Sequence, residues 1–290
     1  MSLDYDRLMR LPVESVTETY TKRDTILYAL GLGVGAADPF DRNELRYVYE
    51  KGLVALPMQA VVLGAGAMKL SDPKFGVNYT MLLHGEQSLQ VHKTLPPEGT
   101  VVSEGKIDEI YDKGASKGAV LYSTRKLFDK ASGDLLVTLG NVVFLRGNGG
   151  FGGKGEGAPK PRPVPADRAA DLQVPVHTSL NQALIYRLSG DYNPLHIDPE
   201  VAGQAGFDRP ILHGLAAYGM VGRALIKALC NDEPQRLRRL DLRFTSPVYP
   251  GEPLHVDVWK VAPGDAAFRL IATQRGVVVE DFGRFEYQAG

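Results

Sequence analysis

The two halves of this chain resemble each other, and this internal repeat limits the folds that the chain can adopt. Residues 26–33 read ILYALGLG and residues 184–191 read LIYRLSGD. Each half continues with an apolar segment rich in small residues, at 57–67 and at 214–224. A repeat of this length indicates that one domain was duplicated and fused, because a solenoid needs at least three units.

A stretch poor in core-forming residues divides the two halves. Residues 147–165 read GNGGFGGKGEGAPKPRPVP, in which glycines come first and alternating prolines follow. Such a composition is typical of a linker that is flexible in its first part and extended in its second. We therefore predict a first repeat over residues 1–146, a linker over residues 147–175 and a second repeat over residues 176–290.

The second half begins with a predicted helix and a loop. Ser179 and Gln182 fit a capping box. The leucines at 180, 184 and 188 share one helical face, and Gly190 is placed to end the helix. Asp191 should therefore lie on a loop, directly beyond a helix.

A buried helix and a run of strands are predicted to follow. Residues 214–229 are apolar or small nearly all round, which is typical of a helix buried on every side. Alternating apolar residues at 240–244, 254–258 and 268–272 predict consecutive strands. This order predicts an α+β layout, in which an antiparallel sheet wraps around one helix.

The matching helix of the first half should be short or irregular. Residues 57–68 begin with Pro57 and are interrupted by Gly64 and Gly66. Each glycine lowers helix stability by roughly 1 kcal/mol relative to alanine. A sheet around a short helix leaves apolar space, and residues 68–81 are expected to border it.

Composition and charge exclude several classes of partner. The net charge is −1, so neither a nucleic acid nor an anionic membrane is indicated. Cys230 is the only cysteine, which excludes an internal disulfide and fits a reducing compartment. No apolar stretch has the length of a membrane helix, and neither terminus resembles a secretory signal or the peroxisomal Ser-Lys-Leu type. We expect a cytoplasmic protein without membrane insertion.

The sequence lacks the context or spacing that a cofactor site or a metal site requires. Gly147, Gly149 and Gly152 match G-x-G-x-x-G, but prolines follow where a dinucleotide site needs a helix N-terminus. The six histidines show no metal-ligand spacing, and a G-x-S-x-G nucleophile motif is absent. The sequence therefore predicts no cofactor and no metal.

The segment SGDYNPLHIDP, residues 189–199, holds the strongest candidates for chemistry. Asp191, Asn193 and His196 stand at offsets of two and five, although each residue type also suits an ordinary turn. The equivalent turn of the first half has Gly33 and Gly35 in place of the first two. Because a duplicated fold needs this turn twice, and only one copy carries the polar set, a catalytic role is favoured.

His213 stands seventeen residues after His196, and Gly214 directly after it opens the buried helix. A helix N-terminus exposes unpaired N–H groups and carries a partial positive charge. An acid–base pair beside such a donor is suited to stabilising an oxyanion.

The segments YRLSGDYNPLHIDP and PILHGLAAYG closely resemble the MaoC-like, (R)-specific 2-enoyl-CoA hydratases, also called hydratase 2. In the first half, RDTILYALGLG, LLHGEQ, YDKG and GGFGG stand where two-repeat members of this family have them. The resemblance spans nearly the whole chain. It implies a double hot-dog fold, in which two antiparallel sheets each wrap around a central helix, with one active site.

The resemblance also implies the reaction. Such enzymes add water across the double bond of a trans-2-enoyl-CoA to give a (3R)-3-hydroxyacyl-CoA, and the reverse is a dehydration. Asp191 and His196 would be the general acid–base pair, and Asn193 would position water or the carboxylate. The backbone N–H of Gly214 would hold the thioester oxygen, while His213 is expected only to start the helix.

The resemblance further implies substrate contacts from both halves. His84, Gly85 and Lys113 match ligand contacts of the first half, and Phe244 matches one of the second. Arg243 adjoins Phe244 and is a candidate for a phosphate contact. The expected partner is an acyl-CoA thioester. A homodimer is a further candidate, although a double hot-dog chain already contains the two-fold repeat that single-repeat relatives build by dimerising.

Three other functions remain open at this point. The first is a dehydratase that acts on thioesters of acyl carrier protein or on branched or dicarboxylic acyl-CoA. The second is a hot-dog thioesterase, and the third is a non-catalytic acyl-CoA-binding module. The Asn-Pro-x-His spacing argues against a thioesterase, and the intact Asp191, Asn193 and His196 argue against a non-catalytic module.

Overall fold

The computed structural model describes residues 3–66, 70–78 and 81–290, and it divides the chain into two compact units. The first unit comprises residues 1–18, 64–93 and 100–161, and the second comprises residues 19–63, 94–99 and 162–290. The helical part of the first repeat thus belongs to the compact unit of the second. The boundaries predicted from the sequence, with a first repeat over 1–146, a linker over 147–175 and a second repeat over 176–290, remain a prediction.

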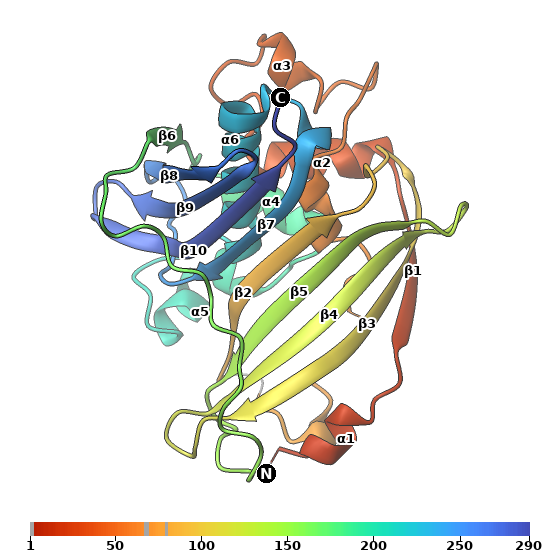
Figure 1. The fold of residues 1–290 in the computed structure, drawn as a ribbon, viewed down its shortest axis with the longest axis vertical. Coiled ribbons are helices and arrows are strands. Elements are labelled where there is room, and N and C mark those ends of the chain that lie inside the picture. Colours follow the sequence, from red (N-terminus) through yellow and green to blue (C-terminus); the bar gives the residue numbers. More distant parts are fainter. Residues whose placement is uncertain (1–2, 67–69, 79–80) are drawn as a thin grey trace. The chain divides into compact units, whose positions relative to one another are not determined.

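The first unit is built on an antiparallel sheet. Its strands follow the order β1-β3-β4-β5-β2. The pairs β3–β4, β4–β5 and β5–β2 are antiparallel. A core of apolar residues lies against this sheet, including Leu8, Phe75 and Leu121. The elements are α1 (Tyr5–Met9), β1 (Glu14–Tyr20, whose last two residues belong to the second unit), η2 (Pro73–Phe75), β2 (Leu82–Val91), β3 (Gly99–Asp112), β4 (Ala119–Asp129) and β5 (Leu135–Leu145), as drawn in Figure 1.

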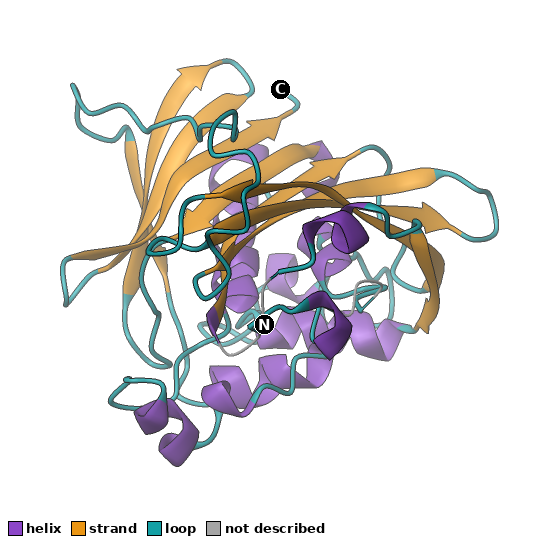
Figure 2. Ribbon diagram, turned by 90° about the horizontal axis from the view of Figure 1, so that it is seen from below, coloured by secondary structure: helices purple, strands orange, loops and turns teal. Residues whose placement is uncertain are grey.

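The strands of the second unit are antiparallel neighbours in the order β7-β10-β9-β8-β6, and this unit contains most of the helices. Its helices lie on one face of its strands (Figure 2). The helices are α2 (Lys22–Gly31), α3 (Arg42–Leu45), η1 (Pro57–Val61), α4 (Gln182–Tyr186), η4 (Arg187–Ser189), η5 (Pro194–His196), α5 (Pro199–Gln204), α6 (Gly214–Cys230) and η6 (Pro234–Arg236). The strands are β6 (Leu172–Val176), β7 (Leu237–Phe244), β8 (Leu254–Ala262), β9 (Asp265–Ala272) and β10 (Val277–Tyr287).

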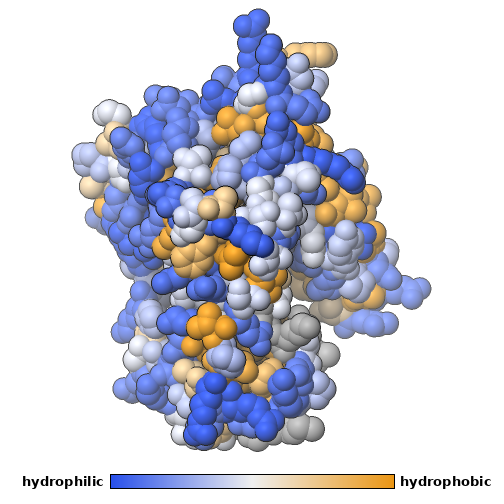
Figure 3. All heavy atoms as spheres, turned by 90° about the vertical axis from the view of Figure 1, so that its right-hand side faces the viewer, coloured by the Kyte–Doolittle hydropathy of each residue, from blue (hydrophilic) through white to orange (hydrophobic). Residues whose placement is uncertain are grey.

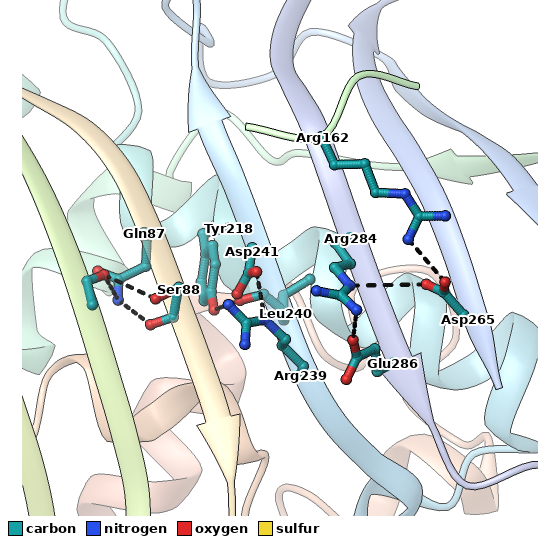
Figure 4. Close-up of polar contacts among 11 residues, drawn as sticks. Gln87, Ser88, Arg162, Tyr218, Arg239, Leu240, Asp241, Asp265, Arg284 and Glu286 are labelled. Carbon is teal, nitrogen blue, oxygen red and sulfur yellow. Dashed lines mark hydrogen bonds and ion pairs between the residues drawn. The ribbon is translucent and has the colours of Figure 1, made fainter. Parts of the chain in front are cut away.

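Helix α6 is the central helix of the second unit and ends one residue beyond the predicted 214–229. Its small residues let neighbouring elements approach closely. A Cβ on Gly219 would lie 2.6 Å from Leu32 of the chain after α2, and a Cβ on Gly222 would lie 2.8 Å from Met58 of η1. The Tyr218 hydroxyl donates to the Leu240 carbonyl of β7 at 2.8 Å, which ties α6 to the sheet (Figure 4).

The opposite face of the second unit's sheet carries paired charges. Arg239 binds Asp241 at 2.6 Å, and Arg162 binds Asp265 at 2.8 Å (Figure 4). These pairs are partly exposed, so each contributes little to stability, about 0–1 kcal/mol. They show that α6 and the charged residues lie on different sides of β7 and β10.

The predicted short helix of the first repeat is confirmed. Among the described residues 57–66 the structure has a single helix, η1, a five-residue 3₁₀ helix that begins at Pro57. Gly64 follows with a φ of 60°, and a Cβ at this position would lie 2.3 Å from the Ser103 Cβ. Residues 67 and 68 of the predicted segment, and residues 68, 69, 79 and 80 of the segment expected to border the apolar space, lie outside the described residues.

The leucine face predicted for this helix is not the buried face of α4. The leucines at 180, 184 and 188 are 80, 49 and 49 % exposed, and the buried side of the helix holds Gln182, Ala183 and Tyr186 instead. The reason is the close approach of α2: a Cβ on Gly31 would lie 3.1 Å from the Tyr186 Cα, and the Gln182 side chain donates to the Gly31 carbonyl. The face of α4 that packs against α2 therefore holds small and hydrogen-bonding residues. It is not the face that carries the leucines.

Other apolar side chains also reach the surface. Phe40 is 84 % exposed, and Figure 3 shows hydrophobic residues among polar ones on one face. In the part of the chain that the structure describes, no helix is both long and apolar enough to cross a membrane.

The close packing of α6 predicts the effect of adding one methyl group. Gly219→Ala places a Cβ against Leu32 and Tyr28, and such overpacking costs about 1–3 kcal/mol. Gly203→Ala is the matched control, because a Cβ on this glycine of α5 would meet no atom within 4 Å and alanine favours a helix. Urea unfolding should show a loss of stability for the first variant and none for the second; equal stability of both would contradict the packing.

Candidate active site

The loop after η4 holds Asp191 and Asn193 through local hydrogen bonds. Gly190 ends η4 with a φ of 116°, a conformation that side chains rarely adopt, which confirms the predicted end of the helix there. The Asp191 carboxylate accepts from the Asn193 N–H at 3.2 Å. The Asn193 side chain in turn caps η5 by accepting from the Leu195 N–H at 3.1 Å. The Asn193 oxygen is thus used for the turn, which leaves its amide group for any contact with water.

His196 ends η5 and is buried, with 8 % of its surface exposed. Its Nδ1 lies 2.9 Å from the Ile211 carbonyl, so Nδ1 carries the proton and Nε2 is left with a lone pair. Burial lowers the pKa of His196, and this effect is opposed by the Ile211 hydrogen bond and by Asp191. A neutral imidazole with a free Nε2 can act as a general base near neutral pH.

His213 packs directly against His196, and the sequence reasoning missed this role. The two rings are stacked, with centroids 3.7 Å apart and an angle of 28° between their planes. His213 Nε2 lies 3.1 Å from the Asp191 backbone carbonyl, and the Tyr186 ring lies 5.0 Å from the His213 ring. Burial, followed by the neighbouring His196, lowers the pKa of His213 to about 4.

Asp191, His196 and His213 also have the distances of a metal site, since each offers a ligand atom within 4.8 Å of the others. However, one nitrogen of each imidazole is already bonded to a backbone carbonyl. The remaining groups suit proton transfer without any metal, and the expected absence of a metal stays a prediction.

Gly214 begins α6 beside this cluster and is exposed. The first N–H groups of a helix have no acceptor within the helix, and the helix dipole adds a partial positive charge there. A Cβ on Gly214 would lie 3.3 Å from Cε1 of Phe244, so the aromatic ring lies against the glycine. The site thus combines a base, a carboxylate, a backbone donor and an apolar wall.

The other residues predicted to contact substrate are placed as follows. Arg243 lies next to Phe244 on β7 and stacks over Phe282, 5.0 Å from the ring centroid. His84 and Gly85 lie at a β-bulge of β2 in the first unit, where His84 Nε2 is 3.1 Å from the Glu86 carbonyl. In the same unit, Lys113 donates to the Gly155 carbonyl at 2.7 Å. The substrate contacts of these residues stay predictions.

Glu280 is a second residue that the sequence reasoning missed. It lies opposite Phe244 in the β7–β10 register and is 1 % exposed. Neither carboxyl oxygen has a hydrogen-bond partner among the described residues, and burial raises the pKa of this glutamate well above its ordinary range. A β-bulge follows, at which Phe282 adopts a φ of 56°, unusual for an aromatic residue. A buried glutamate whose pKa is raised thus lies beside Phe244 in the register of β7 and β10.

Two family models match the chain side by side. The MFE-2 hydratase 2 N-terminal domain matches residues 19–147, and the MaoC-like domain matches residues 163–281. A probable enoyl-CoA hydratase 2 of Dictyostelium discoideum is 38% identical over 290 residues, which cover 98% of this chain and 96% of the relative. The 3-hydroxyacyl-thioester dehydratase Y of Mycobacterium tuberculosis is 41% identical over 281 residues, covering 93% of this chain and 94% of the relative.

Solved structures agree with this fold. The crystal structure of a MaoC-like dehydratase from Phytophthora capsici superposes with a TM-score of 0.86 at 35% identity, and it covers 98% of this chain and 99% of the other. A Mycobacterium tuberculosis protein described as a double hotdog fold has a TM-score of 0.60 at 14% identity, covering 99% of this chain and 98% of the other. The predicted α+β double hot-dog fold is confirmed.

Glu280 predicts a pH dependence of stability. Its pKa is higher in the folded than in the unfolded chain, so the folded state is destabilised as pH rises above about 4.5, its ordinary value, towards the raised pKa. Within this window the cost grows by about 1.4 kcal/mol per pH unit. Glu280→Gln should therefore melt at a higher temperature than the unmodified protein at pH 8, and the difference should vanish near the ordinary pKa.

Thermal melts of the two proteins at several pH values measure this difference. An Asp129→Asn variant is the control, because that carboxylate ends β4 and accepts from the Ser132 N–H, which lowers its pKa, so its contribution has the opposite sign. A melting difference for Glu280→Gln that did not change with pH would contradict a buried, neutral glutamate.

These matches place the chain in the family of MaoC-like, hydratase 2 proteins, which are hydro-lyases, as the sequence predicted.

Proposed function

We propose that this protein catalyses the reversible hydration of trans-2-enoyl-CoA to (3R)-3-hydroxyacyl-CoA. The observation that carries the proposal is the cluster of Asp191 and His196 beside the first residue of α6, in a chain that aligns end to end with a probable enoyl-CoA hydratase 2. The acyl-CoA thioester is the substrate class that the names of these relatives support.

In the proposed mechanism, Asp191 and His196 act on one water molecule. The lone pair of His196 Nε2, with the carboxylate nearby, takes a proton from water as its oxygen attacks C3 of the enoyl group. Negative charge then moves onto the thioester oxygen, where the Gly214 N–H and the positive end of α6 stabilise it. The same pair returns one proton to C2, so the elements of water are added and nothing else is consumed.

The substrate contacts proposed for both repeats follow from the same assignment. Phe244 would bound the acyl group beside Gly214, since its ring already lies against this glycine. Arg243, Lys113 and the His84–Gly85 pair would contact the thioester or the CoA portion. Asn193 would hold the water through its amide group.

The opposite direction is the second candidate function. One relative is named a 3-hydroxyacyl-thioester dehydratase, which supports dehydration of a 3-hydroxyacyl thioester carried by CoA or by acyl carrier protein. The chemistry is the same, and only the carrier and the physiological direction differ. Comparing activity on matched CoA and acyl-carrier-protein thioesters distinguishes the carriers.

Two finer statements stay proposals. Relatives in Arabidopsis thaliana and Mus musculus are named peroxisomal, so the cytoplasmic location rests on the sequence expectation alone. The homodimer rests on the resemblance to the family.

The acid–base assignment predicts the effect of two substitutions. Asp191→Asn and His196→Gln should each lower kcat on the order of 10² to 10⁴-fold while the protein remains folded. The double variant should be little worse than either single variant, because the two groups act as a unit. Loss of enoyl thioester absorbance from crotonyl-CoA measures the rate, and near-normal turnover of either single variant would return the loop to a structural role.

The short η1 helix predicts a preference for longer acyl chains. If the first repeat leaves apolar space for the acyl group, each buried methylene contributes roughly 0.8 kcal/mol, and kcat/KM should rise several-fold per two carbons until the space is filled. Measurements with enoyl-CoA substrates of four, eight, ten and sixteen carbons test this. A steady fall from four carbons upward would mean that the first repeat closes the pocket.

A further inference from the structure

We infer that His213 is a positioning residue of this site, whose neutral imidazole holds the Asp191 backbone and the His196 ring in place beside Gly214. The inference rests on the proposed hydratase function and deepens it. It adds a residue that is not expected to touch the substrate but that contacts both members of the acid–base pair.

The contacts of residues 211–214 carry the inference. The Ile211 carbonyl accepts from His196 Nδ1 at 2.9 Å, and His213 Nε2 lies 3.1 Å from the Asp191 carbonyl. The His213 ring stacks on His196, with centroids 3.7 Å apart. Gly214, the proposed oxyanion donor, is the next residue. One short segment therefore contacts both members of the acid–base pair and contains the proposed oxyanion donor.

The hydrogen bonds also fix the protons. A carbonyl only accepts, so Nε2 of His213 and Nδ1 of His196 must both donate. This leaves His196 Nε2 as the lone pair that faces the reaction. Which nitrogen of a catalytic histidine is basic is set by the bond that the other nitrogen makes.

Helix capping alone does not explain why a histidine stands at position 213. It occupies the N-cap position of α6, where Ser, Thr, Asp or Asn would accept a hydrogen bond from the first turn, yet its side chain makes no capping bond. Its ring is 1 % exposed and is directed back to the Asp191 loop instead.

The first repeat gives an internal comparison. Residues 57–67 align with 214–224, so Leu56 corresponds to His213. Leu56 is also an N-cap, that of η1, with a φ of −76° and a ψ of 128° against −57° and 132° for His213, and it too is buried. The copy that has glycine in place of Asp191 and Asn193 thus has leucine here. The fold needs a buried residue at this position, and it accepts one without a hydrogen bond.

The charges around His213 keep its ring neutral. Asp191 favours a proton on it, whereas Arg187 and His196 oppose one, and the packed Tyr186 ring excludes water. Burial has the largest effect, and together these influences lower the pKa of His213 to about 4. A neutral ring can stack on His196 without suppressing the protonated form that His196 must pass through.

The test compares two substitutions at this position. His213→Leu places the residue of the first repeat there and removes the bond to Asp191. His213→Gln keeps an N–H donor near the place of Nε2. We expect His213→Leu to lower kcat on the order of 10- to 100-fold, because a displacement of about 1 Å costs this much, with KM changed less than about 3-fold. His213→Gln should recover a large part of the lost kcat.

Controls and contrary results are defined as follows. His255→Leu, at a partly exposed histidine on β8, should keep the activity of the unmodified protein. If His213→Leu melts early, His213→Phe takes its place, because it keeps a buried ring but has no donor. Normal kcat in the leucine variant, or equal losses in the leucine and glutamine variants, would overturn the inference. An unmodified protein without hydratase activity would overturn the proposed function instead, so the two failures are distinguishable.

Discussion

The structure depends on how the first turn of α6 is held against the loop of residues 189–199. Two imidazoles and two backbone carbonyls make this connection, through His196 to Ile211 and through His213 to Asp191. These part-buried bonds fix which ring nitrogens carry a proton. They also join the Asp191 loop to the N-terminus of α6.

Burial of α6 makes this arrangement rigid. The glycines of the helix allow the chain after α2, η1 and the sheet to approach closely, and Tyr218 anchors the helix to β7. Most of α6 is closely packed, although Lys227 and Ala228 are exposed and the predicted burial on every side is therefore only partly met. The position of Gly214 is therefore set by the core, which is what a preorganised oxyanion donor requires.

Duplication explains why only one copy carries the chemistry. In a single chain that contains two related repeats, one repeat can keep the polar loop while the other loses it. The first repeat has Gly33 and Gly35 in its turn, Leu56 at its N-cap and only a five-residue helix after it. Because the first repeat lacks the polar residues of this loop, we propose that it shapes the space for the acyl group.

Much of the fold was predictable because its signals are local. Small and apolar residues all round predicted α6, and the glycine after residue 189 predicted the end of η4. The leucines of α4 misled because helical periodicity does not reveal which face a neighbouring helix will approach. Here Gly31 allows α2 to come close to Tyr186, and this contact joins residues far apart in the sequence.

The site was predictable only in part, for a similar reason. Asp191, Asn193 and His196 stand close together in the sequence, whereas the partners that orient Asp191 and His196 come from residues 211–213. His213 resembled a helix-start residue, although its place directly before Gly214, opposite Leu56 of the first repeat, was a signal that could have been used. Glu280 stands between valine and aspartate in an ordinary strand pattern, and a register shift against β9 between Val278 and Glu280 accompanies the burial of both Val279 and Glu280.

The stereochemistry of hydration tests the central claim most directly. The purified protein would be incubated with trans-2-decenoyl-CoA, and the configuration at C3 of the product would be determined by chiral chromatography. A single acid–base site predicts one enantiomer of 3-hydroxydecanoyl-CoA, and the proposed hydratase 2 function predicts that it has the (3R) configuration. Formation of the (3S) product, a racemic mixture, or free CoA in place of a hydroxyacyl product would contradict the account.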